Sequence, residues 1–154
     1  MGDPRMPERR SALVLGAAAF GLASAAMGQR RAAARGDLAT RAQRLEPLTL
    51  GGNDSDFWMS QREYRLETGR YYRWRVASSG RREYNLVAPE LWRNCWIRQI
   101  QVGRIEIKTG TLDELDFDGE GAAEVFFVPV RTGTYPFRLR GLEERGMTGT
   151  VIVE

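Results

Sequence analysis

The side chains best suited to metal chemistry lie in an acidic run at residues 113–120, which reads DELDFDGE. Counted from Glu114, the carboxylates and Gly119 fall at positions 1, 3, 5 and 6 of a calcium-binding EF-hand loop. Position 12 of that loop needs a bidentate glutamate, but here it is Val125. The spacing therefore disfavours calcium and predicts a solvated, charge-rich loop between two strands.

Histidine is absent from the sequence, and Cys95 is the single cysteine. Ser-His-Asp triads, Cys-His dyads and zinc sites with His ligands are therefore impossible within the chain. One cysteine cannot form an intrachain disulfide, and no neighbouring His can lower its pKa, so it is expected to be a small buried apolar residue. We expect that the chain is not an enzyme and has no cofactor.

The charge is divided unevenly along the chain. Residues 1–45 hold eight arginines against three acidic residues, whereas the remainder holds 15 basic and 17 acidic residues. The overall pI of about 9.4 therefore comes from the N-terminal part. A slightly acidic folded part argues against a nucleic-acid partner.

The elements that position these side chains begin with an uncharged stretch from Ser11 to Gln29. It fits a cleavable signal peptide with a cleavage site at residues 23–25, which read ASA. It also fits a retained single-pass anchor, because 19 residues at about 1.5 Å each nearly span a bilayer core. We expect retention, with residues 1–29 as the anchor and with Gly16 and Gly21 allowing close approach of a neighbouring transmembrane helix.

Two regions of different character follow the uncharged stretch. Residues 30–56 are expected to form a linker, with an Ala-rich helix over Arg30–Arg44, an end at Pro47 and a turn-rich link over Thr49–Asp56. Residues 57–154 alternate apolar and polar side chains in short runs separated by glycine turns, which predicts an all-β sandwich. The expected strands are 64–66, 71–76, one or two within 96–107, 125–130, 135–139 and 150–153.

The C-terminal motif carries a resemblance to a known family. From Gly133 the chain reads GTYPFRLRGLEERGMTGTVIVE, which resembles the last two strands of cupredoxins, the blue-copper proteins. The stretch FWMSQREYRLETGRYYRWRV at residues 57–76 resembles their opening strands. The resemblance implies a cupredoxin-like Greek-key β-sandwich. A generic β-sandwich with a tyrosine corner is the alternative, because Gly-Thr-Tyr turns occur in many such folds.

The resemblance also assigns the positions at which the family holds copper. The family's Cys falls on Leu139, its second His on Leu142 and its Met on Met147. The first His falls on Glu83 or Tyr84 in the stretch SSGRREYNLV. A blue-copper centre needs two imidazoles and a thiolate, and its axial Met only tunes the site. The sequence therefore predicts a cupredoxin scaffold without copper, closed by an apolar cap.

Aromatic and arginine side chains supply candidate interface residues. An exposed Trp92 beside Arg93 would suit a protein interface, and so would Arg73 with Arg75 on one face of their strand. The alternatives are that Trp92 and Trp96 cover the open end of the barrel and that the arginines solvate an outer face.

These expectations combine into one functional hypothesis. The chain is expected to be a non-enzymatic accessory subunit of a membrane-bound electron-transfer complex, respiratory or photosynthetic. Its partners would be other subunits and the membrane, with the β domain in the periplasm. One alternative is a soluble exported binding protein released by signal cleavage. Another is a metal carrier that uses Met147, Met59 and carboxylates.

Overall fold

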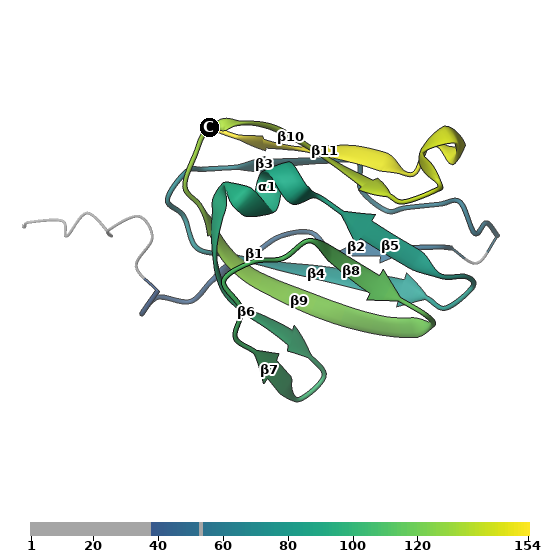
Figure 1. Cartoon of the computed structure of the whole chain (residues 1–154), viewed down its shortest axis with the longest axis horizontal. Coiled ribbons are helices and arrows are strands. Elements are labelled where there is room, and N and C mark those ends of the chain that lie inside the picture. Colours follow the sequence, from purple (N-terminus) through teal and green to yellow (C-terminus); the bar gives the residue numbers. More distant parts are fainter. Residues whose placement is uncertain (1–37, 53) are drawn as a thin grey trace, which may run out of the picture. The chain divides into compact units, whose positions relative to one another are not determined.

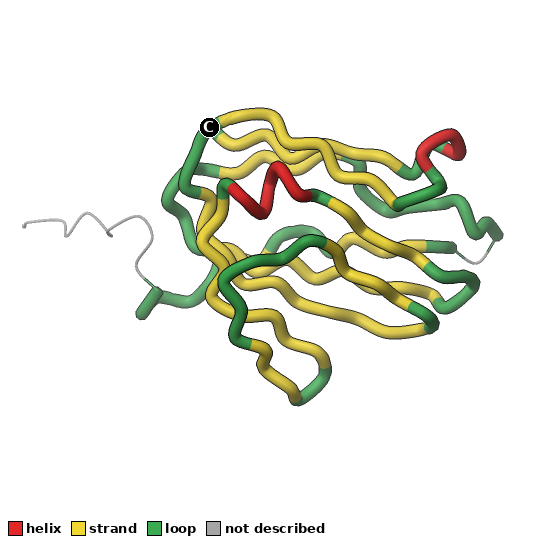
Figure 2. Tube along the Cα trace, viewed as in Figure 1, coloured by secondary structure: helices red, strands yellow, loops and turns green. Residues whose placement is uncertain are grey.

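The computed structural model describes residues 38–52 and 54–154, which form two packed β-sheets with very little helix (Figures 1 and 2). The elements in chain order are β1 Gln43–Arg44, β2 Leu48–Leu50, β3 Glu63–Leu66, β4 Tyr72–Ser79, β5 Tyr84–Val87, α1 Pro89–Arg93, β6 Cys95–Val102, β7 Ile105–Ile107, β8 Glu114–Phe117, β9 Glu120–Pro129, β10 Gly133–Leu139, the 3₁₀ turn η1 Glu143–Arg145, and β11 Thr148–Val153. The all-β sandwich predicted from alternation is confirmed.

The strand order in both sheets is non-sequential. One sheet runs β1-β4-β9-β6-β7, with β2 also paired to β4, and the other runs β3-β11-β10-β5-β8. Among the described strands the chain changes sheet seven times, at every connection except β1–β2, β6–β7 and β10–β11. Such crossings are typical of Greek-key sandwiches, in which segments distant in sequence meet at the ends of the strands.

Alternation along β4 and β10 builds the core. Trp74 is 1% exposed, and its ring lies 5.1 Å from Tyr64 and 5.7 Å from Phe137, both in edge-to-face geometry. Such aromatic pairs add stability beyond the area they bury. Tyr135 donates its hydroxyl to the Arg131 carbonyl at 3.0 Å, which fixes the turn that precedes β10. The inward face of β10 therefore locks both sheets together.

The linker prediction is wrong over the part that the structure describes. Residues 38–44 contain a turn and strand β1 in place of the expected helix, because the backbone N–H of Gln43 donates to the Tyr71 carbonyl just before β4 and β1 pairs with the start of that strand. Leu48 and Leu50 are fully buried in β2, paired parallel with β4, so the sheet begins before the boundary expected at residue 57. Backbone pairing at an open sheet edge outweighs the small helix propensity of this short segment.

The anchor prediction concerns residues 1–29, including Gly16 and Gly21, and lies outside the described residues. Within residues 38–52 and 54–154, no helix has the length and apolar character needed to cross a bilayer.

Candidate functional site

Four loops meet at one end of the sandwich, on the right of Figure 1. We call this region the loop end and define it as residues 51–52, 54–58, 79–83, 117–120 and 139–147. It contains the positions at which the sequence predicts a former copper site. The opposite end carries the C-terminus, just after β11.

Backbone hydrogen bonds gather the three C-terminal positions. The Leu142 amide donates to the Leu139 carbonyl at 3.0 Å, and the Met147 amide donates to the Leu142 carbonyl at 3.2 Å. The Leu139 amide donates to the Met147 carbonyl at 2.9 Å and closes the loop. Gly141 and Gly146 take the positive φ values of 77° and 76° that this tight path requires.

These three side chains are all inside the molecule. Leu139 and Met147 are fully buried and Leu142 is 7% exposed, and each belongs to the main core cluster. The three side chains are therefore packed in the apolar core. Of the three, only Met147 offers a donor atom, a thioether that is a weak ligand.

Glu83 and Tyr84, the two alternatives for the fourth position, point in different directions. Tyr84 is fully buried in β5, and its hydroxyl donates to the Asp56 carbonyl at 2.8 Å. Because Leu86 is the partner of Leu139 and side chains alternate along β5, Tyr84 shares the inner face with Leu139. Glu83 is exposed and lies on the rim of a hollow of about 240 Å³ beside Leu142. The buried position is therefore Tyr84.

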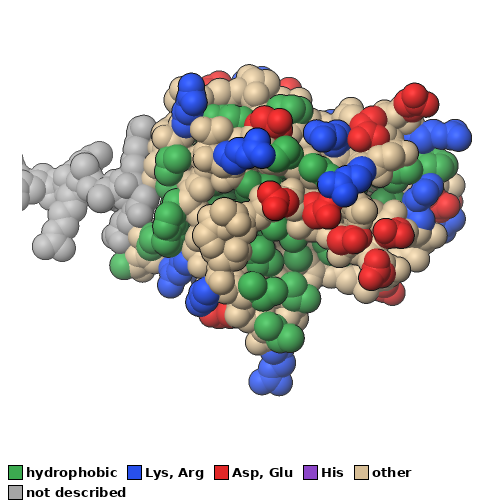
Figure 3. Space-filling view, viewed as in Figure 1, with side chains coloured by type: hydrophobic (Ala, Val, Ile, Leu, Met, Phe, Trp, Pro, Cys, Tyr) green, Lys and Arg blue, Asp and Glu red, His purple; other side chains and the backbone are tan. Residues whose placement is uncertain are grey.

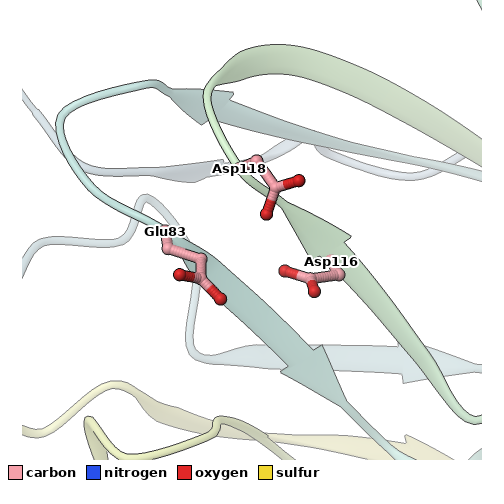
Figure 4. Close-up of side chains that lie close together, drawn as sticks. All are labelled: Glu83, Asp116 and Asp118. Carbon is pink, nitrogen blue, oxygen red and sulfur yellow. The ribbon is translucent and has the colours of Figure 1, made fainter.

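Glu83 instead joins two residues of the acidic run. Its carboxylate, Asp116 and Asp118 offer oxygens within 4.8 Å of one another, and all three side chains are exposed (Figure 4). The pairing of β5 with β8 brings them together, so residues 114–117 form a strand where the sequence predicted a loop. Exposed acidic clusters are common without a bound ion. The three carboxylates do not follow the ligand order of an EF-hand loop, so we do not assign a calcium site here.

Phe57 contacts two other loops of the loop end, and this contact was not predicted from the sequence. Its ring lies between two guanidinium groups, with Arg82 Cζ 5.0 Å and Arg145 Cζ 4.9 Å from the ring centroid. Cation–π contacts of this kind connect residues 51–58 to the turn before β5 and to η1. Beside them, Gly51, Trp58, Ser79 and their neighbours line an open hollow of about 620 Å³. No spacing in the sequence predicts this three-loop contact.

The structure places Trp92 in the core, which corrects its expected exposure. Its side chain is 4% exposed and packs against Trp74 and Phe127, with ring centroids 6.0 Å and 5.6 Å away. Arg93 at the end of α1 is exposed, and the surface tryptophan near it is Trp96, at 47%. Trp92 is therefore a core residue, so the interface prediction fails for it, while Trp96, which the alternative interpretation also expected to be covered, is exposed.

Cys95 is unsuited to redox chemistry. Burial raises the pKa of its thiol to about 12, so almost no thiolate is present at neutral pH. This agrees with the expectation of a small apolar residue.

Arg73 and Arg75 are engaged within the sheet. Both contact the Glu124 carboxylate, Arg75 at 3.4 Å, and Arg73 also lies over the Phe126 ring. Burial opposes ionisation of Glu124, but hydrogen bonds and positive charge from Arg73 and Arg75 outweigh it and leave its pKa below the usual value. The charges of the two arginines are therefore largely balanced by Glu124 on the outer face of the sheet, which makes them weak candidates for binding a partner.

Glu124→Gln is expected to destabilise the fold at neutral pH by on the order of 1 kcal/mol. The pKa is lower in the folded state, so the ion pairs stabilise it above the ordinary carboxyl pKa of about 4.3, and this stability is lost as the pH falls through the lowered value. Denaturation midpoints of both proteins from neutral to acidic pH should converge, with the exposed Glu120→Gln as control. A gap that stays constant with pH would contradict the ion-pair account.

Solved structures similar to this chain are copper proteins. A multicopper oxidase from Campylobacter jejuni, titled a metallo-oxidase, matches with a TM-score of 0.53 and 9% identity over 74% of this chain and 30% of that one. A second multicopper oxidase matches with a TM-score of 0.56 and 9% identity, covering 75% and 45%. Auracyanin from the photosynthetic bacterium Roseiflexus castenholzii is 17% identical, covering 70% and 94%, with a TM-score of 0.45.

These similarities show a cupredoxin-like fold, and at such identities they show the fold alone. The chain spans less than half the length of either oxidase. No protein-family model and no curated protein sequence matches the chain. Tyr84, Leu139, Leu142 and Met147 include no thiolate and no imidazole, so these side chains do not fit a blue-copper centre, which needs one thiolate and two imidazoles.

Proposed function

We propose that this protein is a copper-free, non-enzymatic accessory subunit, docked on the periplasmic side of a membrane-bound electron-transfer complex. The observation that carries the proposal is the packed loop end. Leu139, Leu142 and Met147 fill with apolar contacts the region where a cupredoxin holds copper. A cupredoxin-like domain without a metal site can bind a partner but cannot transfer electrons through a copper centre of its own.

The chemistry of the side chains supports a role without catalysis. The chain has no histidine, and its one thiol is buried with a raised pKa. A general acid or base would have to come from carboxylates, and the three that cluster at the loop end are exposed to water. Positioned, desolvated groups with tuned pKa values are what a catalytic site requires.

The membrane attachment rests on the sequence. The stretch from Ser11 to Gln29 is uncharged and rich in Ala and Gly, which makes it a weak lone anchor and a good packing partner for other transmembrane helices. The assignment to electron transfer and to the periplasm rests on the resemblance to cupredoxins. Loss of the copper ligands at Leu139, Leu142 and Tyr84 or Glu83 is part of the same proposal.

Docking would use the exposed surface at the end of the sandwich where Leu38 enters. Trp96 is 47% and Val130 is 59% exposed, and the Val130 amide donates to the carbonyl of Asn94, the residue after the exposed Arg93, at 2.9 Å. Exposed tryptophan and arginine side chains dominate protein-binding energies. Trp96 therefore replaces Trp92 as the candidate interface tryptophan.

The test solubilises membranes of the native host under mild detergent and follows the size and N-terminus of the protein. Wild-type chain with an intact N-terminal segment is expected in a large assembly. The double variant Trp96→Ala, Arg93→Glu should be released from it, while the control Trp58→Ala, Arg104→Glu should stay bound. A mature N-terminus at Ala26 or Gln29 rules out the anchor. Wild-type protein running as a free monomer rules out docking.

A further inference from the structure

The β6–β7 hairpin leaves an apolar strip uncovered at the edge of its sheet. Ile105 is 66%, Ile107 45% and Val102 44% exposed, and all three lie on the same face because Ile105 pairs with Val102 and Ile107 with Ile100. Figure 3 shows hydrophobic side chains along this projecting hairpin and a basic side chain at its tip. Apolar residues on an edge strand favour pairing with another strand.

The backbone of β7 is open on its outer side. Among the described residues, β7 pairs only with β6. Gly103, with φ +56°, and Arg104 form a two-residue turn, so the flanking pair Val102 and Ile105 exchanges hydrogen bonds. Inward and outward backbone hydrogen bonding alternates along β7, so the N–H and C=O of Glu106 point outward. Lys108 lies one residue beyond the end of β7, and its N–H and C=O point outward when pairing extends the strand to it.

Charge selects one register for pairing β7 with a copy of itself. In an antiparallel pair, outward-facing residues must oppose one another, so Glu106 can oppose Arg104, Glu106 or Lys108 of the second copy. A register with Glu106 opposite Arg104 would require the turn residue to join the strand pair. Registers with Glu106 opposite Glu106, or Lys108 opposite Lys108, place like charges together. Only Glu106 against Lys108 joins opposite charges on both sides of the two-fold axis.

We propose that two copies of this chain pair antiparallel through β7, with Ile107 opposite Ile107 and Glu106 opposite Lys108. The Lys108 ammonium already lies 2.9 Å from Glu106 in its own strand, so the dimer makes a ring of four alternating charges. The apolar strips of the two hairpins join into one face across the axis. The pairing is isologous, as a two-fold interface requires.

The paired strands are short, so the interface is small and the dimer is weak in free solution. The proposal does not depend on the accessory-subunit function, because β7 is present whether or not the N-terminal segment is retained. Retention would strengthen the pairing, since two tethered chains have a high effective concentration.

Cysteine cross-linking of the full chain tests the register. Ile107→Cys places two thiols directly opposite each other, within the Cα range that a disulfide accepts. Ile105→Cys places its thiols about four residues apart, roughly 14 Å along the strands, beyond that range. Mild oxidation with diamide is therefore expected to convert Ile107→Cys to a covalent dimer and to leave Ile105→Cys, exposed Val130→Cys and the wild type with its partly buried Cys95 largely monomeric.

A charge swap supplies the second readout. Adding Glu106→Lys to Ile107→Cys should reduce cross-linking several-fold, because lysines then oppose Lys108. Adding Lys108→Glu as well should restore it. Failure of Ile107→Cys to cross-link, equal cross-linking by Ile105→Cys or Val130→Cys, or no rescue by the swap would each overturn the proposal. None of these outcomes bears on whether the chain docks in a larger assembly.

Discussion

Leu142→Asp is expected to lower the free energy of unfolding by on the order of 3 kcal/mol, because it exchanges a core methyl pair for a carboxylate. Leu142 is 7% exposed and its backbone links Leu139 to Met147. Burying an unpaired charge is among the few mechanisms by which one substitution costs this much. Equilibrium unfolding in denaturant at neutral pH measures the shift in midpoint.

Two controls separate this effect from a general sensitivity to charge. Leu142→Met keeps the volume and apolar character, so it should cost less than about 1.5 kcal/mol. Val130→Asp places the same charge on a side chain that is 59% exposed, where a change within about 0.5 kcal/mol is expected. If Leu142→Asp leaves the midpoint where it was, the residue is not part of a packed cap and belongs to a surface patch.

Seven of the eleven strands among the described residues were predicted, because their signal is local. Tyr72, Trp74 and Val76 alternate with arginines in β4, and the period of two assigns their faces without knowledge of any partner. The same argument located β3, β10 and β11, and it placed one or two strands within residues 96–107, where the structure has β6 and β7. Strand β2 escaped it, because the buried leucines of Leu48–Leu50 precede a glycine-rich turn that dominated the composition of that stretch.

The arrangement of the loop end was not predictable in this way, because its contacts join segments far apart in sequence. Phe57 meets Arg82 and Arg145 only after three loops converge. Glu83 meets Asp116 only because β5 pairs with β8, which no spacing reveals. The burial of Trp92 likewise depends on how α1 packs across Trp74 and Phe127. The alternation of apolar and polar residues predicts which face of a strand a side chain lies on, whereas the strand order decides which residues it contacts.

The alternation of β5 makes the proposed former copper position testable. Tyr84 and Leu86 share the buried face, and Leu86 is the partner of Leu139, whereas Glu83 points outward to Asp116 and Asp118. Wild-type protein offers no thiolate and no imidazole at these positions, so adding Cu(II) should produce no intense visible absorption from thiolate-to-copper charge transfer.

Rebuilding the donors should reverse that result. The triple variant Leu139→Cys, Leu142→His, Tyr84→His places one thiolate and two imidazoles around Met147, and Cu(II) should then give an intense visible band. The matched variant Leu139→Cys, Leu142→His, Glu83→His should give none, because the imidazole at residue 83 faces the exposed carboxylates. Circular dichroism before metal addition establishes that both variants are folded. A folded triple variant with His at residue 84 and no band would show that the correspondence between this loop and the cupredoxin site is wrong. A band only in the variant with His at residue 83 would move the first ligand to the outer face of β5.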